Sequence, residues 1–193
     1  MNLPAHKTLQ RFTWSDYQTW PDEERWELIG GEAWSMAPAP TTGHQDIALN
    51  IAFALKKGLI GKVCKPFVSP IDVRLSDEDV VQPDVLVVCQ PEKIKPSHIE
   101  GAPELMIEVL SPSTATRDLR DKKALYERHG VGEYIIVDPL EHYAIRFLRG
   151  SDALYDKGTV FGADEMLTVS SLDNLGIPLW EVFGLPAPVP PPA

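Results

Sequence analysis

A strand-like run, a helical run and a second strand-like run follow one another between residues 104 and 139, and this order limits the folds open to the chain. The first run reads ELMIEVLS, and the SPST segment that overlaps its end supplies hydroxyl groups suited to capping a helix. The helical pattern RDLRDKKALYERHG ends at Gly130, and EYIIVDP then returns to a strand pattern. Strand, helix and strand in this order favour a right-handed crossover between parallel strands. We therefore expect an α/β fold.

Further strand-like runs surround this unit. KVCKPFV, PIDVRLS and PDVLVVC precede ELMIEVLS, and we expect these four runs to be neighbours in one sheet. RWELIGGEAWSM alternates on both sides of Gly30 and Gly31, which predicts an N-terminal hairpin, preceded by a short helix capped by Thr13 or Ser15. Residues 42–57 have a helical apolar pattern. After residue 140 we expect a C-terminal β region and a final packed segment.

The length of 193 residues fits one domain, which we place at residues 1–184, and the proline-rich residues 185–193 are expected to be a disordered tail. No apolar run approaches the roughly 20 residues of a membrane span, and no secretion signal is visible, so a cytoplasmic protein is expected. Cys64 and Cys89 lack metal-type spacing and are expected to be reduced thiols.

Two carboxylates interrupt runs that otherwise have the composition of buried strands. Residues 106, 108 and 110 of an extended strand share one face, so Glu108 stands between Met106 and Leu110 with no evident route to solvent. Asp84, at the start of PDVLVVC, likewise shares one strand face with apolar residues, here Leu86 and Val88. Fully buried carboxylates are rare unless they are paired or bound to metal, which makes both residues candidate metal ligands. The alternative is a buried ion pair or a cap on a neighbouring strand.

The helical segment after Glu108 carries a lysine on its inward side. At about 100° per residue, Lys122 lies near the centre of the inward arc, with Asp118 at its edge and Lys123 towards the opposite edge. The other residues of this arc, with Tyr126 expected to belong to the core, are Leu119, Leu125, Tyr126 and His129. A lysine beside carboxylates can stabilise the negative charge that develops in phosphodiester hydrolysis. The alternative is a Lys122 that reaches solvent and pairs with Asp118.

Several segments in a fixed order resemble a known family. QPDVLVV, APELMIEVLSPST and RDLRDKKALYERHGVGEYIIVDP, preceded by WELIGGE and GHQDIALNI, closely resemble the Uma-type family of restriction-endonuclease-like proteins, a branch of the PD-(D/E)XK nuclease superfamily. The resemblance covers nearly the whole chain up to the proline-rich tail. It implies a restriction-endonuclease-like core in which a central mixed β-sheet is flanked by helices.

The resemblance also implies a divalent metal site. Asp84 matches the aspartate of the PD motif, Glu108 the acidic residue of the next strand, and the backbone carbonyl of Val109 a further ligand. Such carboxylate sites suit Mg²⁺ or Mn²⁺, whereas no closed set of cysteines and histidines favours zinc. Glu27 of WELIGGE matches a further catalytic glutamate. For Glu27 the alternative is a cross-strand salt bridge in the hairpin.

The resemblance places the catalytic lysine on the helix rather than on the strand. The superfamily motif has a lysine two residues after the strand acid, where this chain has Leu110, and the family position on the following helix is Lys122. His44 and Gln45 match a polar pair in the family's first long helix. For His44 the alternative is a hydrogen-bonded histidine of the core.

The function expected from these residues is metal-dependent hydrolysis of DNA phosphodiesters, with a homodimer supplying two sites for cleavage of two strands. The net charge of −10 opposes DNA binding, although a metal-binding carboxylate cluster is itself acidic. Basic residues are gathered in two groups, which are Lys56, Lys57, Lys62 and Lys65, and Arg117, Arg120, Lys122, Lys123 and Arg128. For each group the alternative is an ordinary solvated helix face. The alternative function is an inactive nuclease-fold module that binds nucleic acid or a partner protein.

Overall fold

The computed structural model describes residues 6–7, 10–21, 23–36 and 39–189, and it has a mixed α/β fold built on two mixed six-stranded sheets. The helices are α1 (Trp14–Tyr17), α2 (Thr42–Gly58), η1 (Pro91–Lys93), η2 (Arg117–Lys122), α3 (Lys123–His129), η3 (Ser170–Leu172) and α4 (Leu179–Val182). Within the described residues, none of these helices is long and apolar enough to cross a membrane. The α/β fold class expected from the sequence is confirmed.

The central sheet contains the predicted crossover. Its strands, in spatial order, are β12 (Thr159–Gly162), β11 (Tyr143–Leu148), β10 (Glu133–Asp138), β9 (Leu105–Val109), β7 (Val85–Val88) and β4 (Lys65–Val68). Strands β9 and β10 are parallel and are joined through η2 and α3, whereas the other neighbours are antiparallel. The ends of β7 and β9 therefore bring Asp84 and Glu108 to the same part of the sheet.

The N-terminal sheet separates strands that were expected to be neighbours. Its strands, in spatial order, are β1 (His6–Lys7), β3 (Glu32–Ser35), β2 (Trp26–Ile29), β6 (Val80–Val81), β5 (Asp72–Arg74) and β8 (His98–Glu100). The expected hairpin at Gly30 and Gly31 is present, and both glycines have positive φ. The expectation of one sheet for the four runs before residue 111 is wrong: β5 pairs with β6 and β8, while β4, β7 and β9 pair in the central sheet.

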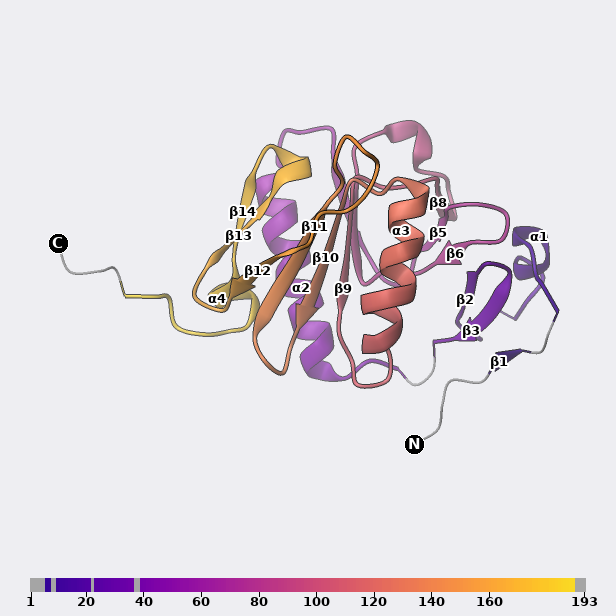
Figure 1. The fold of residues 1–193 in the computed structure, drawn as a ribbon, viewed down its shortest axis with the longest axis horizontal. Helices are drawn as coiled ribbons and strands as arrows, with labels where there is room; N and C mark the ends of the chain where they lie inside the picture. Colours follow the sequence, from indigo (N-terminus) through magenta and orange to yellow (C-terminus); the bar gives the residue numbers. More distant parts are fainter. Residues whose placement is uncertain (1–5, 8–9, 22, 37–38, 190–193) are drawn as a thin grey trace.

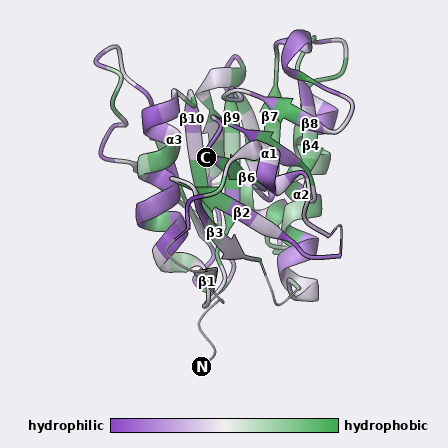
Figure 2. Ribbon diagram, turned by 90° about the vertical axis from the view of Figure 1, so that its right-hand side faces the viewer, coloured by the Kyte–Doolittle hydropathy of each residue, from purple (hydrophilic) through white to green (hydrophobic). Residues whose placement is uncertain are grey.

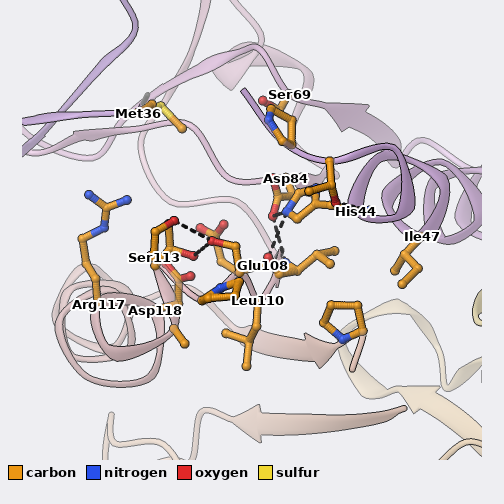
Figure 3. Close-up of a pocket in the computed structure, with 18 of the residues that line it drawn as sticks. Met36, His44, Ile47, Ser69, Asp84, Glu108, Leu110, Ser113, Arg117 and Asp118 are labelled. Atoms are coloured by element: carbon orange, nitrogen blue, oxygen red, sulfur yellow. Dashed lines mark hydrogen bonds and ion pairs between the residues drawn. The ribbon is translucent and has the colours of Figure 1, made fainter. Parts of the chain in front are cut away.

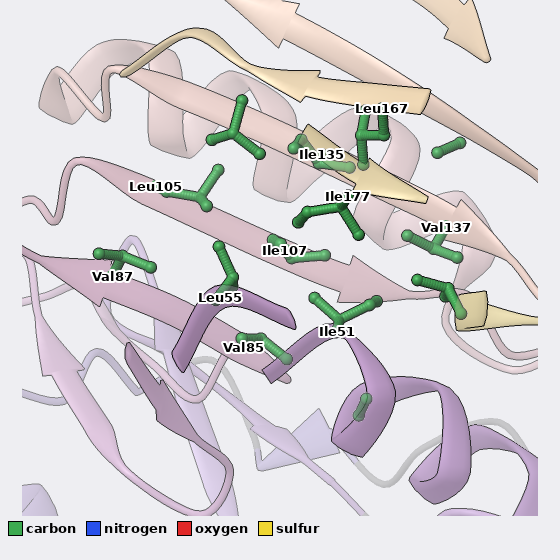
Figure 4. Close-up of a cluster of buried hydrophobic side chains, with 14 of the residues drawn as sticks. Ile51, Leu55, Val85, Val87, Leu105, Ile107, Ile135, Val137, Leu167 and Ile177 are labelled. Carbon is green, nitrogen blue, oxygen red and sulfur yellow. The ribbon is translucent and has the colours of Figure 1, made fainter. Parts of the chain in front are cut away.

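Helices α2 and α3 cover opposite faces of the central sheet (Figure 1). Figure 4 shows side chains of α2 and of the hairpin formed by β13 (Met166–Val169) and β14 (Leu175–Pro178) meeting the sheet in one apolar cluster. The labelled members are Ile51, Leu55, Val85, Val87, Leu105, Ile107, Ile135, Val137, Leu167 and Ile177. The strands β7 and β9 are largely apolar, whereas α3 carries many hydrophilic residues (Figure 2). Strands β7 and β9 are buried along their whole length, so a charged side chain on β9 has to find its partners inside the protein.

The helical connection from β9 to β10 begins with a π-helical segment, η2, before it continues as α3. A π-helix turns less per residue than an α-helix, so residues before Lys122 depart from the α-helical arc. Leu119, expected on the inward arc, is 40% exposed, whereas Leu125 and Tyr126 are buried as expected. The inward position of Lys122 itself is retained, with 2% exposure.

The two cysteines form a disulfide, which corrects the expectation of reduced thiols. The antiparallel register pairs Lys65 of β4 with Val88 of β7, so Cys64 and Cys89 stand opposite each other at the next position. At the C-terminus, residues 185–189 have no helix or strand, and residues 190–193 of the expected tail lie outside the described residues.

Asp79 ties the N-terminal hairpin to α3. Its carboxylate accepts hydrogen bonds from the Gly30 N–H at 2.7 Å and the Ser76 hydroxyl at 3.0 Å, and it contacts His129 Nε2 at 2.8 Å. Burial raises the pKa of Asp79, but the hydrogen bonds from His129, Gly30 and Ser76 outweigh it and hold this pKa well below its usual range. The residue connects the hairpin that carries Glu27 to the helix that follows Lys122.

We expect Asp79→Ala to lower the free energy of unfolding by about 2–3 kcal/mol near neutral pH, because buried donors lose their acceptor. The control Asp77→Ala, which removes an exposed carboxylate paired with Arg74, should change it by less than about 0.5 kcal/mol. Because the folded pKa of Asp79 is depressed, the difference between wild type and Asp79→Ala should shrink as the pH falls below about 4. Urea denaturation at several pH values measures both effects, and equal stabilities of the two variants would contradict this role for Asp79.

Candidate active site

Glu108 lies inside the protein at the end of β9, on the face of the central sheet that α3 covers. Its residue exposure is 3%, and one oxygen, Oε1, accepts hydrogen bonds from Lys122 Nζ at 2.8 Å and from the Tyr126 hydroxyl at 2.7 Å. Both donors come from the helical connection that leads from β9 to β10. The strand therefore presents a buried carboxylate directly to the inward side of that connection.

Lys122 joins carboxylates from three elements. Its Nζ lies 2.8 Å from Glu27 Oε1 of β2, 2.8 Å from Glu108 Oε1 and 3.9 Å from Asp118 Oδ1. Because Lys122 is 2% exposed, it does not extend to solvent, and its closest carboxylates are Glu27 and Glu108 rather than Asp118. Glu27 is fully buried, and its other hydrogen bond comes from the Gln82 N–H at 3.0 Å. The expected alternatives of a solvent-reaching lysine and a cross-strand pair in the hairpin are therefore not observed.

Asp84, Val109 and His44 form a second set of contacts at the ends of β7 and β9. Asp84 Oδ2 accepts a hydrogen bond from the Val109 N–H at 2.8 Å and lies 3.2 Å from His44 Nε2. The same His44 nitrogen lies 2.9 Å from the Val109 carbonyl oxygen. The ring comes from the first turn of α2, where Thr41 caps the helix. One imidazole nitrogen thus contacts two of the three groups that the sequence indicates as metal ligands (Figure 3).

Both sets of contacts open into one cavity of about 690 Å³. Figure 3 shows His44 and Asp84 together on one side of the close-up, with Asp118 and Arg117 on the other and Glu108 between them. Residues 39–41, 43–44, 108–115 and 138–140 contribute much of the lining, which is largely apolar around these few charged groups. A cavity of this volume, with a small number of convergent polar groups, is typical of a ligand or substrate site.

Comparison with known proteins assigns the family. The Uma2 family model, described as "Putative restriction endonuclease", matches residues 14–179. The chain belongs to the Uma2 family. A crystal structure described as "a putative nuclease belonging to DUF820" from Anabaena variabilis ATCC 29413 has a TM-score of 0.74 and 18% identity, covering 90% of this chain and 98% of that one. The fold of this Uma2 protein is therefore that of a known structure.

A match to one curated relative covers a smaller share of both chains. "Uncharacterized protein slr1290" from Synechocystis sp. (strain ATCC 27184 / PCC 6803 / Kazusa) is 27% identical over 126 residues. The match covers 63% of this chain and 66% of the relative, which is just under two thirds of the relative's length. The Uma2 assignment confirms the resemblance found in the sequence.

The buried groups of this Uma2 site favour their protonated forms. Burial raises the pKa of Glu108 to about 8; Lys122 opposes this rise, whereas the neighbouring carboxylates add to it. Burial also raises the pKa of Asp118. Burial lowers the pKa of Lys122, but Glu108 and Glu27 outweigh it, so this pKa lies above its usual value. Burial likewise opposes the charge on His44, and contact with Asp84 raises its pKa overall.

Acidic groups outnumber permanent cations in this cluster. Four carboxylates face two permanent cations, and the six residues are Glu27, Asp84, Glu108, Asp118, Arg117 and Lys122. Two carboxylate oxygens, Glu27 Oε2 and Asp118 Oδ1, are buried without a hydrogen-bond partner. Buried carboxylates are costly unless cations or donors compensate them, so this cluster is suited to taking up further positive charge.

The structure groups most of the residues singled out in the sequence. Glu27, Glu108, Asp118 and Lys122 form one contact network, while Asp84, Val109 and His44 form the adjoining one. Gln45 does not join them, because it is exposed on the outer side of α2 beside a small hollow that Asp84 also lines. The physical reason is helical geometry: residue 45 points about 100° away from His44.

Two residues of the site, Tyr126 and Arg117, were not predicted from the sequence to belong to it. Tyr126, expected only as core, donates its hydroxyl to Glu108. Its position four residues after Lys122, on the same helix face, was the available signal. Arg117, expected only as one of several basic residues, lies with its Nη2 3.7 Å from Glu27 Oε2. No sequence pattern predicted that contact, because Glu27 and Arg117 are 90 positions apart and meet only through packing of the N-terminal sheet on the helical connection.

Proposed function

We propose that this Uma2 protein is a metal-dependent endonuclease that hydrolyses phosphodiester bonds in DNA with Mg²⁺ or Mn²⁺. The observation that carries the proposal is the convergence of Asp84, Glu108 and the buried Lys122 on one cavity. Carboxylates beside a lysine form a combination suited to phosphodiester hydrolysis, in which developing negative charge has to be stabilised. Membership of a family described as "Putative restriction endonuclease" supports the same reaction class.

The donor set fits a hard divalent cation. Asp84 and Glu108 offer carboxylate oxygens and Val109 a carbonyl oxygen, the ligand type that Mg²⁺ and Mn²⁺ prefer, and His44 offers an imidazole nitrogen once it loses its Nε2 proton. Among the described residues, no three histidine, cysteine, aspartate or glutamate side chains form a ready-made metal cluster. A site with few protein ligands that leaves positions for water and phosphate is the arrangement Mg²⁺ usually adopts. When bound, the ion would polarise the phosphate and lower the pKa of a coordinated water.

Lys122 is assigned the task of stabilising charge on the phosphate. Its ammonium is held by Glu27 and Glu108, so it needs little reorganisation when a phosphate oxygen becomes more negative. Glu108, Glu27 and Asp118 keep the ammonium protonated, and Glu27 of β2 and Asp118 of the same segment η2 help to fix its position. Tyr126 orients the Glu108 carboxylate through Oε1, and we assign the other oxygen, Oε2, to the metal.

The experiment that tests the proposal is cleavage of supercoiled plasmid and of labelled oligonucleotides by the purified protein. We expect cleavage with Mg²⁺ or Mn²⁺, and loss of cleavage when EDTA removes the metal. Products should be traced on both strands, since a symmetric dimer would supply two sites and cut both. Absence of cleavage of any DNA at saturating metal would contradict the proposal.

A second candidate function is a nuclease-fold module without activity, which binds nucleic acid or a partner protein. The observation that favours it is that Lys122 Nζ and His44 Nε2 already contact Glu108 and Asp84, so these two carboxyl groups have partners without metal. The same assay separates the two functions, because an inactive module would bind DNA with equal affinity in EDTA and in Mg²⁺ and cleave none of it.

A further inference from the structure

Arg117 is a buried cation of the cavity lining whose hydrogen-bond donors are largely unused. Its side chain is 12% exposed, and two of its nitrogens, Nε and Nη1, are buried without a hydrogen-bond partner. Nη2 lies 3.7 Å from Glu27 Oε2, which is beyond hydrogen-bond length, and the guanidinium lies 5.9 Å from the centre of the Trp34 ring. Unused donors on a buried guanidinium are costly, so this group calls for an acceptor.

The other permanent cations that line the cavity already have acceptors. Among the described residues these are Arg25 and Lys122. Arg25 donates to Gln82 at 2.8 and 3.0 Å and to Ser69 at 2.8 Å, whereas Lys122 contacts Glu27 and Glu108. Arg117 is therefore the lining cation best able to take a new anionic partner. Figure 3 shows its side chain rising from the helical segment beside Ser113, across the close-up from His44.

The chemistry of the group selects the anion. A guanidinium binds phosphate through paired N–H donors, and this geometry holds a phosphate in a fixed orientation. Four acidic side chains line the same cavity, namely Asp84, Glu108, Asp118 and Asp138, so a phosphate that enters needs a cationic contact away from them. Arg117 supplies that contact in the same cavity as Glu108, on the same helical connection as Lys122.

We propose that Arg117 binds a phosphate of the substrate strand next to the phosphate that is hydrolysed, and so positions the strand in the cavity. The inference rests on the proposed phosphodiesterase function and adds a second phosphate subsite to it. A purely structural Arg117, which only offsets the charge of Glu27, would affect stability and every substrate alike. A phosphate-binding Arg117 acts only on substrates that carry a neighbouring phosphate.

The test compares two substrates. Bis(p-nitrophenyl) phosphate has one phosphodiester and no neighbouring phosphate, whereas a short single-stranded oligonucleotide has several. We expect Arg117→Gln to reduce kcat/KM for the oligonucleotide about 10-fold more than for bis(p-nitrophenyl) phosphate, mainly through KM. Arg117→Lys, which keeps the charge but loses the paired donors, should lie between Arg117→Gln and wild type. The matched control Arg120→Gln removes an exposed arginine of the same segment and should change either substrate by no more than about twofold.

Oligonucleotide affinity with Ca²⁺ in place of Mg²⁺, measured by fluorescence anisotropy, provides a readout that does not need turnover. We expect about 10-fold weaker binding for Arg117→Gln than for Arg120→Gln. Equal losses on both substrates, no loss, or equal affinities of the two variants would overturn the subsite. If Arg117→Gln and Arg117→Lys both unfold, the role is structural and the inference is wrong. If wild type hydrolyses neither substrate, the proposed function fails, while the anisotropy comparison still decides whether Arg117 binds the strand.

Discussion

Replacing Lys122 with methionine is expected to lower the single-turnover rate of DNA cleavage by about 10²–10³, whereas Lys123→Met should cleave at nearly the wild-type rate. The two residues are adjacent and carry the same charge, but their surroundings differ. Lys122 is buried against Glu27 and Glu108, while Lys123 places its ammonium 4.5 Å from the centre of the Phe147 ring. Both variants lose one positive charge, so any effect of net charge on DNA binding should be the same for both. A difference between their cleavage rates therefore reports on the role of Lys122 in the site.

This comparison requires that the Lys122→Met variant is folded under the assay conditions. Removing one partner of a buried ion pair commonly costs about 3–5 kcal/mol, because the other charge stays buried. Here Glu108 can take up a proton, since its pKa is already raised to about 8 and Lys122 is the group that lowers it. Melting curves measured with and without Mn²⁺ check the fold. Lys122→Gln, which keeps a donor for Glu27 and Glu108, replaces the methionine variant if that variant melts below the assay temperature.

The outcome discriminates between three arrangements. A selective loss in Lys122→Met supports a charge-stabilising lysine on the helix. Equal rates for the two variants would exclude Lys122 from the reaction. A larger loss in Lys123→Met would show that the ammonium acting on the phosphate comes from the next position along the helix.

Asp84→Asn and Glu108→Gln are expected to abolish Mn²⁺ binding while leaving the fold intact. Each substitution preserves shape and removes the negative charge that a divalent ion needs, so the loss should exceed the roughly 10–100-fold seen when only groups that support a ligand are removed. Isothermal titration calorimetry measures it. The matched control is Asp138→Asn, which removes a carboxylate from the lining of the same cavity, where Asp138 accepts hydrogen bonds from the backbone N–H groups of Leu140 and Glu141.

The pH dependence of the same titration gives an independent check. Because burial raises the pKa of Glu108 to about 8, a metal ion has to displace its proton below that pH. Mn²⁺ affinity of the wild type should therefore rise as the pH increases towards about 8, with release of a proton on binding. Unchanged affinity in both Asp84→Asn and Glu108→Gln would rule out these residues as ligands.

Local patterns were sufficient to predict the crossover and the burial of Glu108 and Lys122. The strand run around Glu108 and the helical run around Lys122 each place their charged residue inward by periodicity alone, and both residues are buried in the structure. The hairpin at Gly30 and Gly31 followed from turn chemistry. These features depend on residues close together in the sequence, which is why the sequence was informative about them.

Features that depend on packing between distant segments could not be predicted. The pairing of β5 with β6 and β8 places a run expected in the central sheet in the N-terminal sheet. The disulfide between Cys64 and Cys89 depends on the register of β4 against β7. The contact of Glu27 with Lys122 likewise requires the N-terminal sheet to pack on the helical connection. The π-helical start of that connection, which exposes Leu119, could not be predicted, because the helical arc assumed the α-helical turn of about 100° per residue throughout.

The central claim is that Asp84 and Glu108 hold a divalent ion at the cavity, and the most direct test is anomalous diffraction from crystals soaked in Mn²⁺. We expect an anomalous peak within coordination distance of Asp84, Glu108 and the Val109 carbonyl oxygen, with His44 displaced from its contact between Asp84 and Val109 or turned into a ligand. A map with no anomalous peak at saturating Mn²⁺, in which His44 still joins Asp84 to Val109 and Lys122 still pairs with Glu108, would contradict the claim.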